Sequence, residues 1–228
     1  DKTKHADIII RNNRREAHGP TAGSTRNARI EWPMTSGKWY WEIESTRTGT
    51  NNGGQQVGIC TDEYDTRSTS YPGQTAYTWA INGNDGDLHH NGSIVVTDYC
   101  LVGGTSNGTV MTTGNICMCA YDADAGKFWM GMNGTWGNNS GTGNPATGAN
   151  PGVSSGLTGK QIFPIASTGT DSGANHVTLN PGDRKFAYQA PSGFKALCTQ
   201  NLPDTFTESN VNNPSKFFDI IRWKGYGV

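Results

Sequence analysis

The chain has 228 residues and a formal net charge of −1 at pH 7, and only 16% of its residues are charged. This balance excludes a protein that binds nucleic acid or an anionic membrane through a large overall charge. The 31 glycines are typical of short strands joined by tight turns, and the length suits one large β-sandwich or barrel with a single core.

Segments with the alternation of β-strands follow one another along the sequence. In the most regular segment, residues 38–45, the side chains of Trp39, Trp41 and Ile43 share one face of an extended strand and Glu42 points to the other. No amphipathic helical pattern precedes residue 200. We expect strands, in chain order, at 8–10, 28–32, 38–45, 56–60, 77–81, 94–96, 115–121, 128–132, 161–167 and 176–180.

Strands that each carry one apolar face predict an all-β fold, in which two antiparallel sheets pack together as a sandwich. The large side chains on these faces would fill the space between the sheets. The predicted core consists of Trp39, Trp41, Ile43, Ile59, Trp79, Ile81, Met118, Phe128, Met130 and Ile165.

The sequence contains five cysteines, an odd number that cannot pair completely within one chain. Cys117 and Cys119 are two residues apart in a strand, so they share a face and are poorly placed to bond each other. We interpret the cysteines as small core or interface residues of a protein assembled under reducing conditions. No apolar signal segment is present, and no apolar stretch approaches the roughly 20 residues that span a bilayer, so we expect no membrane insertion.

Four segments resemble the signature of SPRY domains. Residues 37–43 (Gly-Lys-Trp-Tyr-Trp-Glu-Ile) resemble the opening strand of the family, and residues 57–59 (Val-Gly-Ile) resemble the segment that follows it. Residues 121–134 are similar to the SPRY hairpin, in which an acidic turn precedes a strand ending in Asn-Gly, and residues 162–165 match the next strand. The resemblance implies a concanavalin A-like jelly-roll sandwich that binds partners through its loops and has no known catalytic centre.

The sequence also resembles a phage subgroup of this family. Residues 71–73 (Tyr-Pro-Gly), followed by an aromatic strand and an Asn-Asp-Gly turn, are similar to that subgroup, and residues 186–203 resemble its ending. The resemblance implies a virion component, such as a tail fibre, a receptor-binding protein or a head decoration.

These patterns divide the chain into three expected parts. Residues 1–29 would be an N-terminal strand and basic segment that makes an assembly contact or supplies the first sandwich strand. Residues 30–203 would form the SPRY-like sandwich. Residues 204–228 would be a linker and the start of a following module or an exchanged strand, because residues 217–221 form a short apolar run.

Aromatic side chains beside polar turn residues suit the recognition of sugars or protein loops. The ligand-binding candidates in the expected loops are Tyr64, Tyr71, Asp87, His89 and Trp136. Tyr71 and Trp136 are equally compatible with a structural role, in which each ring fixes its loop to the sandwich.

Enzymatic and metal-binding alternatives rest on a few acidic and histidine residues. Glu42 and Glu44 lie on one strand face, but glycosidases need a carboxylate pair across a cleft, and we expect this pair to be structural. The histidine pair 89–90 beside Asp85 and Asp87 is the best candidate for a metal, although neighbouring residues of a strand point to opposite faces. We therefore predict no catalytic residue, no metal and no cofactor.

We interpret the chain as a non-enzymatic structural or recognition module of a bacteriophage virion, assembled in the host cytoplasm. The main hypothesis is a tail-fibre or receptor-binding component that holds a host surface glycan or protein. The alternatives are a decoration or assembly protein that contacts only other virion proteins, and a glycan-cleaving enzyme. No nucleic acid partner is expected. A homo-oligomer is expected, a trimer if the protein is a fibre, with Cys117, Cys119 and the region of Ile220 at the subunit contacts.

Overall fold

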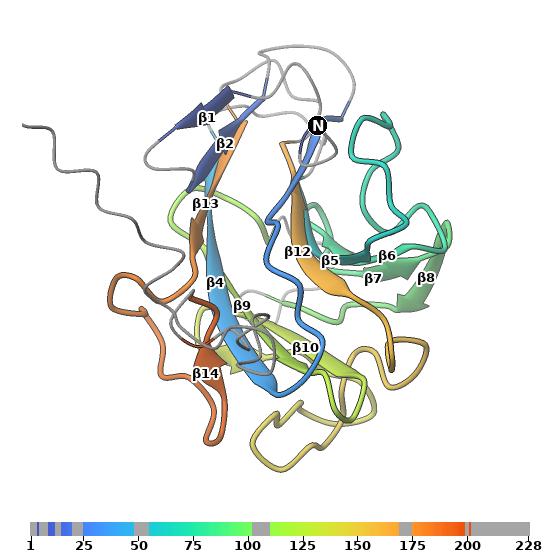
Figure 1. Cartoon of the computed structure of the whole chain (residues 1–228), viewed down its shortest axis with the longest axis vertical. Coiled ribbons are helices and arrows are strands. Elements are labelled where there is room, and N and C mark those ends of the chain that lie inside the picture. The colour runs from blue at the N-terminus through green and yellow to red at the C-terminus, as the bar shows by residue number, and fades with distance from the viewer. Residues whose placement is uncertain are drawn as a thin grey trace, which may run out of the picture.

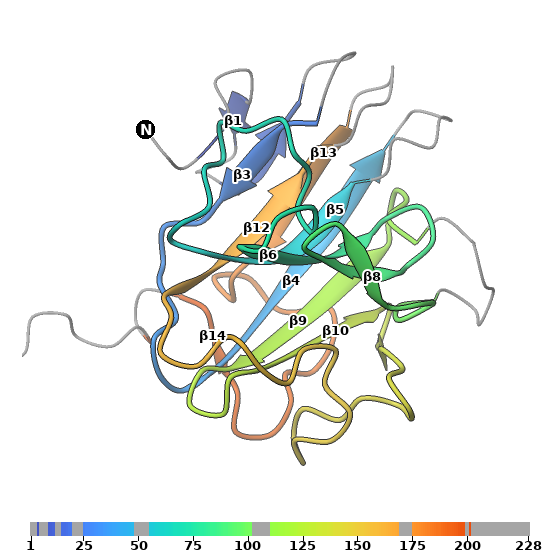
Figure 2. The same ribbon diagram turned by 90° about the vertical axis from the view of Figure 1, so that its right-hand side faces the viewer.

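The structure is a computed structural model that describes residues 4, 9–11, 15–19, 25–47, 55–101, 110–168, 175–198 and 201. These residues form two β-sheets that face each other as a sandwich (Figures 1 and 2). The predicted all-β, two-sheet architecture is therefore confirmed.

The larger sheet has eight strands, and β4 is at its centre. All of its pairings are antiparallel except that of β14, which runs parallel to the first part of β4. Its order is β1 (Ile9–Arg11), β2 (Glu16–His18), β13 (Asn175–Asn180), β4 (Lys38–Arg47), β9 (Ile116–Asp122), β10 (Lys127–Met132) and β11 (Thr135–Trp136), with β14 (Lys195–Ala196) also paired to β4.

The smaller sheet has six strands and is antiparallel throughout. Its order is β3 (Asn27–Arg29), β12 (Ile162–Ser167), β5 (Gln56–Thr61), β6 (Thr78–Asn82), β7 (Leu88–His90) and β8 (Ser93–Val96). All ten predicted strands are present with small shifts at their ends, whereas β2, β7, β11 and β14 were not predicted. Strands β1, β2 and β3 show that residues before 30 contribute to both sheets.

The main core fills the space between the two sheets. Trp41 is fully buried there and stacks on Phe128, with 5.9 Å between the ring centroids. All ten side chains predicted for the core are buried. Eight of them belong to the main core, but Met118 and Ile165 lie on the opposite faces of their sheets.

The outer face of each sheet is also covered, so each carries an additional apolar cluster. On the eight-stranded sheet, residues 181–197 cover the outer aromatic cluster, which consists of Tyr40, Met118, Ala120, Trp129 and Phe194. On the six-stranded sheet, the connection 62–77 contributes to the loop cluster, which consists of Cys60, Tyr64, Phe163 and Ile165. Met118 and Ile165 are therefore buried as predicted, but they lie on the outer faces of β9 and β12 rather than between the sheets.

All five cysteines are free, and four of them are buried. The sulfur atoms of Cys117 and Cys119 are 3.9 Å apart, and both side chains are fully buried in the main core. Their expected place at subunit contacts is therefore wrong, because no part of either side chain reaches the surface. In the described part of the chain, no helix has the length and apolar character to cross a membrane.

Two further expectations concern the loops and the C-terminus. Residues 137–156 form the expected long loop, and its backbone is fastened at several points; for example, Trp129 Nε1 donates to the carbonyl oxygen of Ala149 at 2.8 Å. The part expected at 204–228, including Ile220, lies outside the described residues.

Candidate functional site

A corner of the six-stranded sheet exposes apolar side chains. We call it the hairpin face, and it consists of the outer surface of β7 and β8 with the adjoining residues 71–77. Tyr77, Ile94 and Val95 are 42%, 53% and 50% exposed, and they are three of the four large hydrophobic side chains exposed in the described part of the chain. Figure 2 shows β8 at the margin of the sheet, facing the viewer.

The local sequence explains why this hairpin forms. Asn91 and Gly92 have φ angles of 50° and 73°, as a two-residue turn with both central residues in the left-handed region requires. His89 pairs with Ile94, and Leu88 pairs with Val96, so Val95 is an extra residue at a β-bulge. The bulge lies in the edge strand and leaves Val95 half exposed.

The connection before β6 is held against the same hairpin. The backbone N–H groups of Asn91 and Gly92 donate to the carbonyl oxygens of Thr75 and Gly73 at 3.2 and 3.0 Å. Gly73 has a φ of +94°, and a Cβ there would lie 2.7 Å from the Cβ of His89. Glycine is therefore needed at position 73 for this close approach. Tyr71, two residues earlier, is half-buried.

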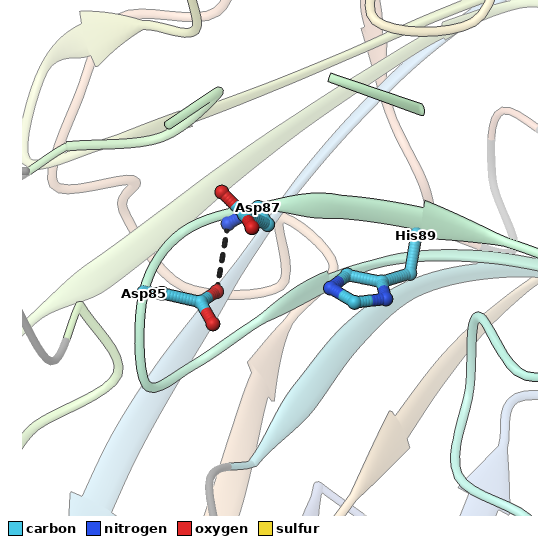
Figure 3. A group of neighbouring side chains, drawn as sticks. All are labelled: Asp85, Asp87 and His89. Carbon is cyan, nitrogen blue, oxygen red and sulfur yellow. Dashed lines mark hydrogen bonds between the residues drawn. The ribbon is translucent and has the colours of Figure 1, made fainter. Parts of the chain in front are cut away.

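An acidic turn adjoins the hairpin face. Asp87 is 7% exposed, and one of its carboxylate oxygens accepts a hydrogen bond from the backbone N–H of Asp98 at 2.6 Å. Asp85, Asp87 and His89 each offer a ligand atom, and these atoms lie within 4.8 Å of one another (Figure 3). His90 points to the other face, where its ring stacks on Trp79 at a centroid distance of 4.2 Å.

Two of the predicted site residues lie elsewhere. Tyr64 is only 2% exposed, and its hydroxyl donates to the carbonyl oxygen of Ser70 at 2.7 Å. The expected exposed ring is therefore a buried anchor for the connection 62–77. Half-buried Trp136 lies on the other sheet, where its ring meets Tyr40 edge-on at 6.3 Å. The structure thus places Tyr71, Asp87 and His89 at the six-stranded sheet, whereas Trp136 lies on the eight-stranded sheet.

The glutamate pair considered for catalysis is part of the scaffold. The carboxylate of Glu42 is 3% exposed and accepts hydrogen bonds from the hydroxyl of Tyr40 and the backbone N–H groups of Ala187 and Tyr188, each at 2.9 Å. Glu44 is half exposed and lies 3.8 Å from Arg184. Glu42 therefore has little freedom to act as an acid or a nucleophile.

Comparison with known proteins identifies the central part of the chain. Residues 38–142 match the family model of the SPRY domain. This part of the chain is therefore similar to SPRY domains. Two solved SPRY structures are similar to a larger part of the chain: the crystal structure of the SPRY domain of human HERC1 and a crystal structure of a human SPRY domain. The HERC1 domain has a TM-score of 0.53 and 16% sequence identity, and the match covers 78% of this chain and 94% of that one. The second structure has a TM-score of 0.52 and 15% identity, and the match covers 78% of this chain and 98% of that one. No curated protein sequence matches the chain.

The SPRY domain match contains the whole hairpin face, from Tyr71 to Val95. Sequence reasoning did not select Tyr77, Ile94 or Val95 as site residues. The signal for the last two was present, because Asn91-Gly92 is a strong hairpin turn and the apolar run 94–96 follows it directly. The structure adds that this strand is at the edge of its sheet, which the alternation of apolar and polar residues cannot show.

Proposed function

We propose that the SPRY domain is a non-enzymatic module that binds a partner protein through the hairpin face. SPRY domains are protein-interaction modules, and the family match covers this face. The observation that carries the proposal is the exposure of two neighbouring apolar side chains of the edge strand β8, Ile94 and Val95, which are 53% and 50% exposed. Exposed apolar side chains that gather beside polar turns are typical of interaction surfaces.

The position of β8 supports the same surface. β8 ends the six-stranded sheet, so one side of its backbone has no neighbouring strand among the described residues. An extended segment of a partner is able to add to such an edge through main-chain hydrogen bonds, while Ile94 and Val95 supply apolar contacts.

The narrower proposal places this module in a bacteriophage virion, as a tail-fibre or receptor-binding component for a host surface glycan or protein. It is supported by the resemblance of residues 186–203 to the ending of a phage subgroup. Residues 186–197 pack on the sandwich, with Phe186 edge-on to Tyr40 at a centroid distance of 4.8 Å. A decoration or assembly role would use the same face to bind other virion proteins.

The first test measures whether the hairpin face binds. Peptides are selected on the purified chain from a random displayed library, and their affinities are then measured for the double variant Ile94→Asp with Val95→Asp. The control is Ser154→Asp with Ser155→Asp, which adds the same charge at two exposed residues of the loop 137–156. We expect the hairpin variant to lose at least about tenfold in affinity, as loss of central apolar contacts does, while the control keeps it. Equal affinity for both variants would place the binding surface elsewhere.

A second test addresses the ligand class. The same three proteins are applied to a glycan array and incubated with glycans in solution. Binding of a glycan by the wild type, lost in the hairpin variant, would favour a glycan receptor over a protein partner. Release of reducing ends that disappears in Glu42→Gln would contradict the non-enzymatic proposal, and we expect none.

A further inference from the structure

The turn between β6 and β7 brings three metal-ligating side chains together. Asp85 and Asp87 lie on either side of Gly86, and His89 follows on the same face of β7 as Asp87. Gly86 has a φ of +81°, and a Cβ there would collide with the carbonyl oxygen of Cys100, so the turn is held in one tight form. Figure 3 shows the ring of His89 directed toward the two carboxylates.

The histidine lacks the partner that a buried imidazole needs. Nε2 of His89 is shielded from solvent and has no hydrogen-bond partner among the described residues. Its neighbour His90 differs, because Nδ1 of His90 donates to the carbonyl oxygen of Thr78 at 2.9 Å. Burying a polar nitrogen without a hydrogen bond is costly, and a bound cation would remove that cost.

The carboxylates are already oriented by donors from the surrounding chain. Asp85 accepts hydrogen bonds at 3.0 Å from the side-chain amide of Asn82 and from the backbone N–H of Asp87. Asp87 accepts one from the backbone N–H of Asp98 at 2.6 Å, and Oδ1 of Asp98 is itself buried without a partner in the described part of the chain. Such donors fix ligand carboxylates in metal sites.

The charge of this turn is also uncompensated. Among the described residues, neither Asp85 nor Asp87 forms an ion pair with a lysine or an arginine. Two carboxylates separated by a few ångströms repel each other, and a divalent cation between them converts the repulsion into attraction.

We propose that Asp85, Asp87 and His89 bind a divalent first-row transition metal, with zinc as the best fit. Calcium and magnesium select oxygen ligands, whereas zinc accepts a mixture of imidazole nitrogen and carboxylate oxygen. Donor atoms about 2.1 Å from a tetrahedral ion lie about 3.4 Å from one another. The three ligand atoms lie within 4.8 Å, so small side-chain rotations bring them to this distance and leave a fourth position for water.

The site is tested by isothermal titration with zinc chloride of the purified 228-residue chain, from which metal has been removed with EDTA. We expect one saturable equivalent of zinc, a higher melting temperature with zinc than with EDTA, and no comparable binding of calcium or magnesium. His89→Gln and the nearly isosteric Asp85→Asn are each expected to weaken zinc binding by at least about tenfold. His176→Gln is the matched control, because it removes a histidine of the other histidine pair, whose rings stack at 4.2 Å.

The zinc-edge X-ray absorption spectrum of the wild-type complex gives a readout that does not depend on any variant. Nitrogen and oxygen ligands with one imidazole support the site, and a sulfur ligand contradicts it. Absence of a saturable equivalent in the wild type, or equal affinity in wild type and His89→Gln, would overturn the proposal. These outcomes are separate from peptide binding at Ile94 and Val95, so either proposal is able to fail alone.

Discussion

Trp41 shows how much the main core depends on single side chains. Its ring is fully buried and stacks on Phe128, yet its indole Nε1 has no hydrogen-bond partner among the described residues. Trp129 differs, because its Nε1 donates to the carbonyl oxygen of Ala149 at 2.8 Å. The contribution of Trp41 to stability therefore comes from packing, reduced by an unsatisfied N–H group.

This contrast predicts two different costs at position 41. Trp41→Ala leaves a large cavity and should lower the free energy of unfolding by about 3–5 kcal/mol. Trp41→Phe keeps an aromatic ring against Phe128 and removes the unsatisfied donor, so its cost should be clearly smaller. Urea denaturation followed by circular dichroism measures both, and an equal loss in the two variants would show that stacking is unimportant.

Alternation in the sequence predicted which way most core side chains point, and it failed where both faces of a strand are apolar. In β4, Glu42 marks the face opposite Trp41, so the inward side is identifiable. In β9, Met118 and Ala120 alternate with Cys117 and Cys119, and neither set is polar. The sequence therefore offered no reason to place the cysteines, rather than Met118, between the sheets.

At the scale of elements, the C-terminal segment 181–197 completes the sandwich from outside. It is attached through the carboxylate of Glu42, through the pairing of β14 with β4, and through Phe194, whose ring meets Trp129 edge-on at 6.3 Å. A buried carboxylate that accepts backbone hydrogen bonds is costly to alter, because the donors lose their partner.

Glu42→Gln should therefore destabilise the protein by about 1–3 kcal/mol, because one acceptor oxygen becomes an amide that repels the backbone donors. The matched control is Glu44→Gln, which affects only a half-exposed pair with Arg184 at 3.8 Å and should change stability little. Hydrogen exchange should rise at Ala187 and Tyr188 in Glu42→Gln alone. Unchanged exchange there would show that the segment is held by other contacts.

The four strands missed by sequence reasoning are among the shortest, with two or three residues each. β11 and β14 have two residues each, and β7 has only Leu88, His89 and His90, so none is long enough for a period of two to emerge. The candidate site was predictable in part, because Asp87 and His89 lie two residues apart and share a face. The site lies close to the exposed apolar strand at Ile94 because β7 pairs with β8, and the sequence alone does not show which strands pair.

For the whole molecule, burial of weak acids links stability to alkaline pH. Burial raises the pKa of the Cys60 thiol to about 12, and it also raises the pKa of the phenols of Tyr40, Tyr64, Tyr99 and Tyr121. These groups stay neutral in the folded chain but ionise when the chain unfolds. Their contribution is therefore complete below pH 9 and is lost as the pH rises toward 12.

We accordingly expect the urea midpoint to be flat near neutral pH and to fall steeply between pH 9 and 10.5. Cys60 alone should contribute about 2 kcal/mol of this fall at pH 10.5, because its thiol is fully buried. Cys60→Ala should lower stability at pH 7 and show a smaller decrease between pH 7 and pH 10.5. An identical pH dependence in the wild type and in Cys60→Ala would mean that this thiol does not titrate on unfolding.

The central position of β4 also determines the order in which the molecule is completed during synthesis. β4 is made before its neighbours, which are β9, at Ile116–Asp122, and β13 and β14, which end at Asn180 and Ala196. Until those segments leave the ribosome, Trp39, Trp41 and Tyr40 have no sheet to join. Such distant pairings slow folding, so the nascent chain would expose its aromatic strand until these segments have been made. It would benefit from a chaperone that binds extended apolar segments.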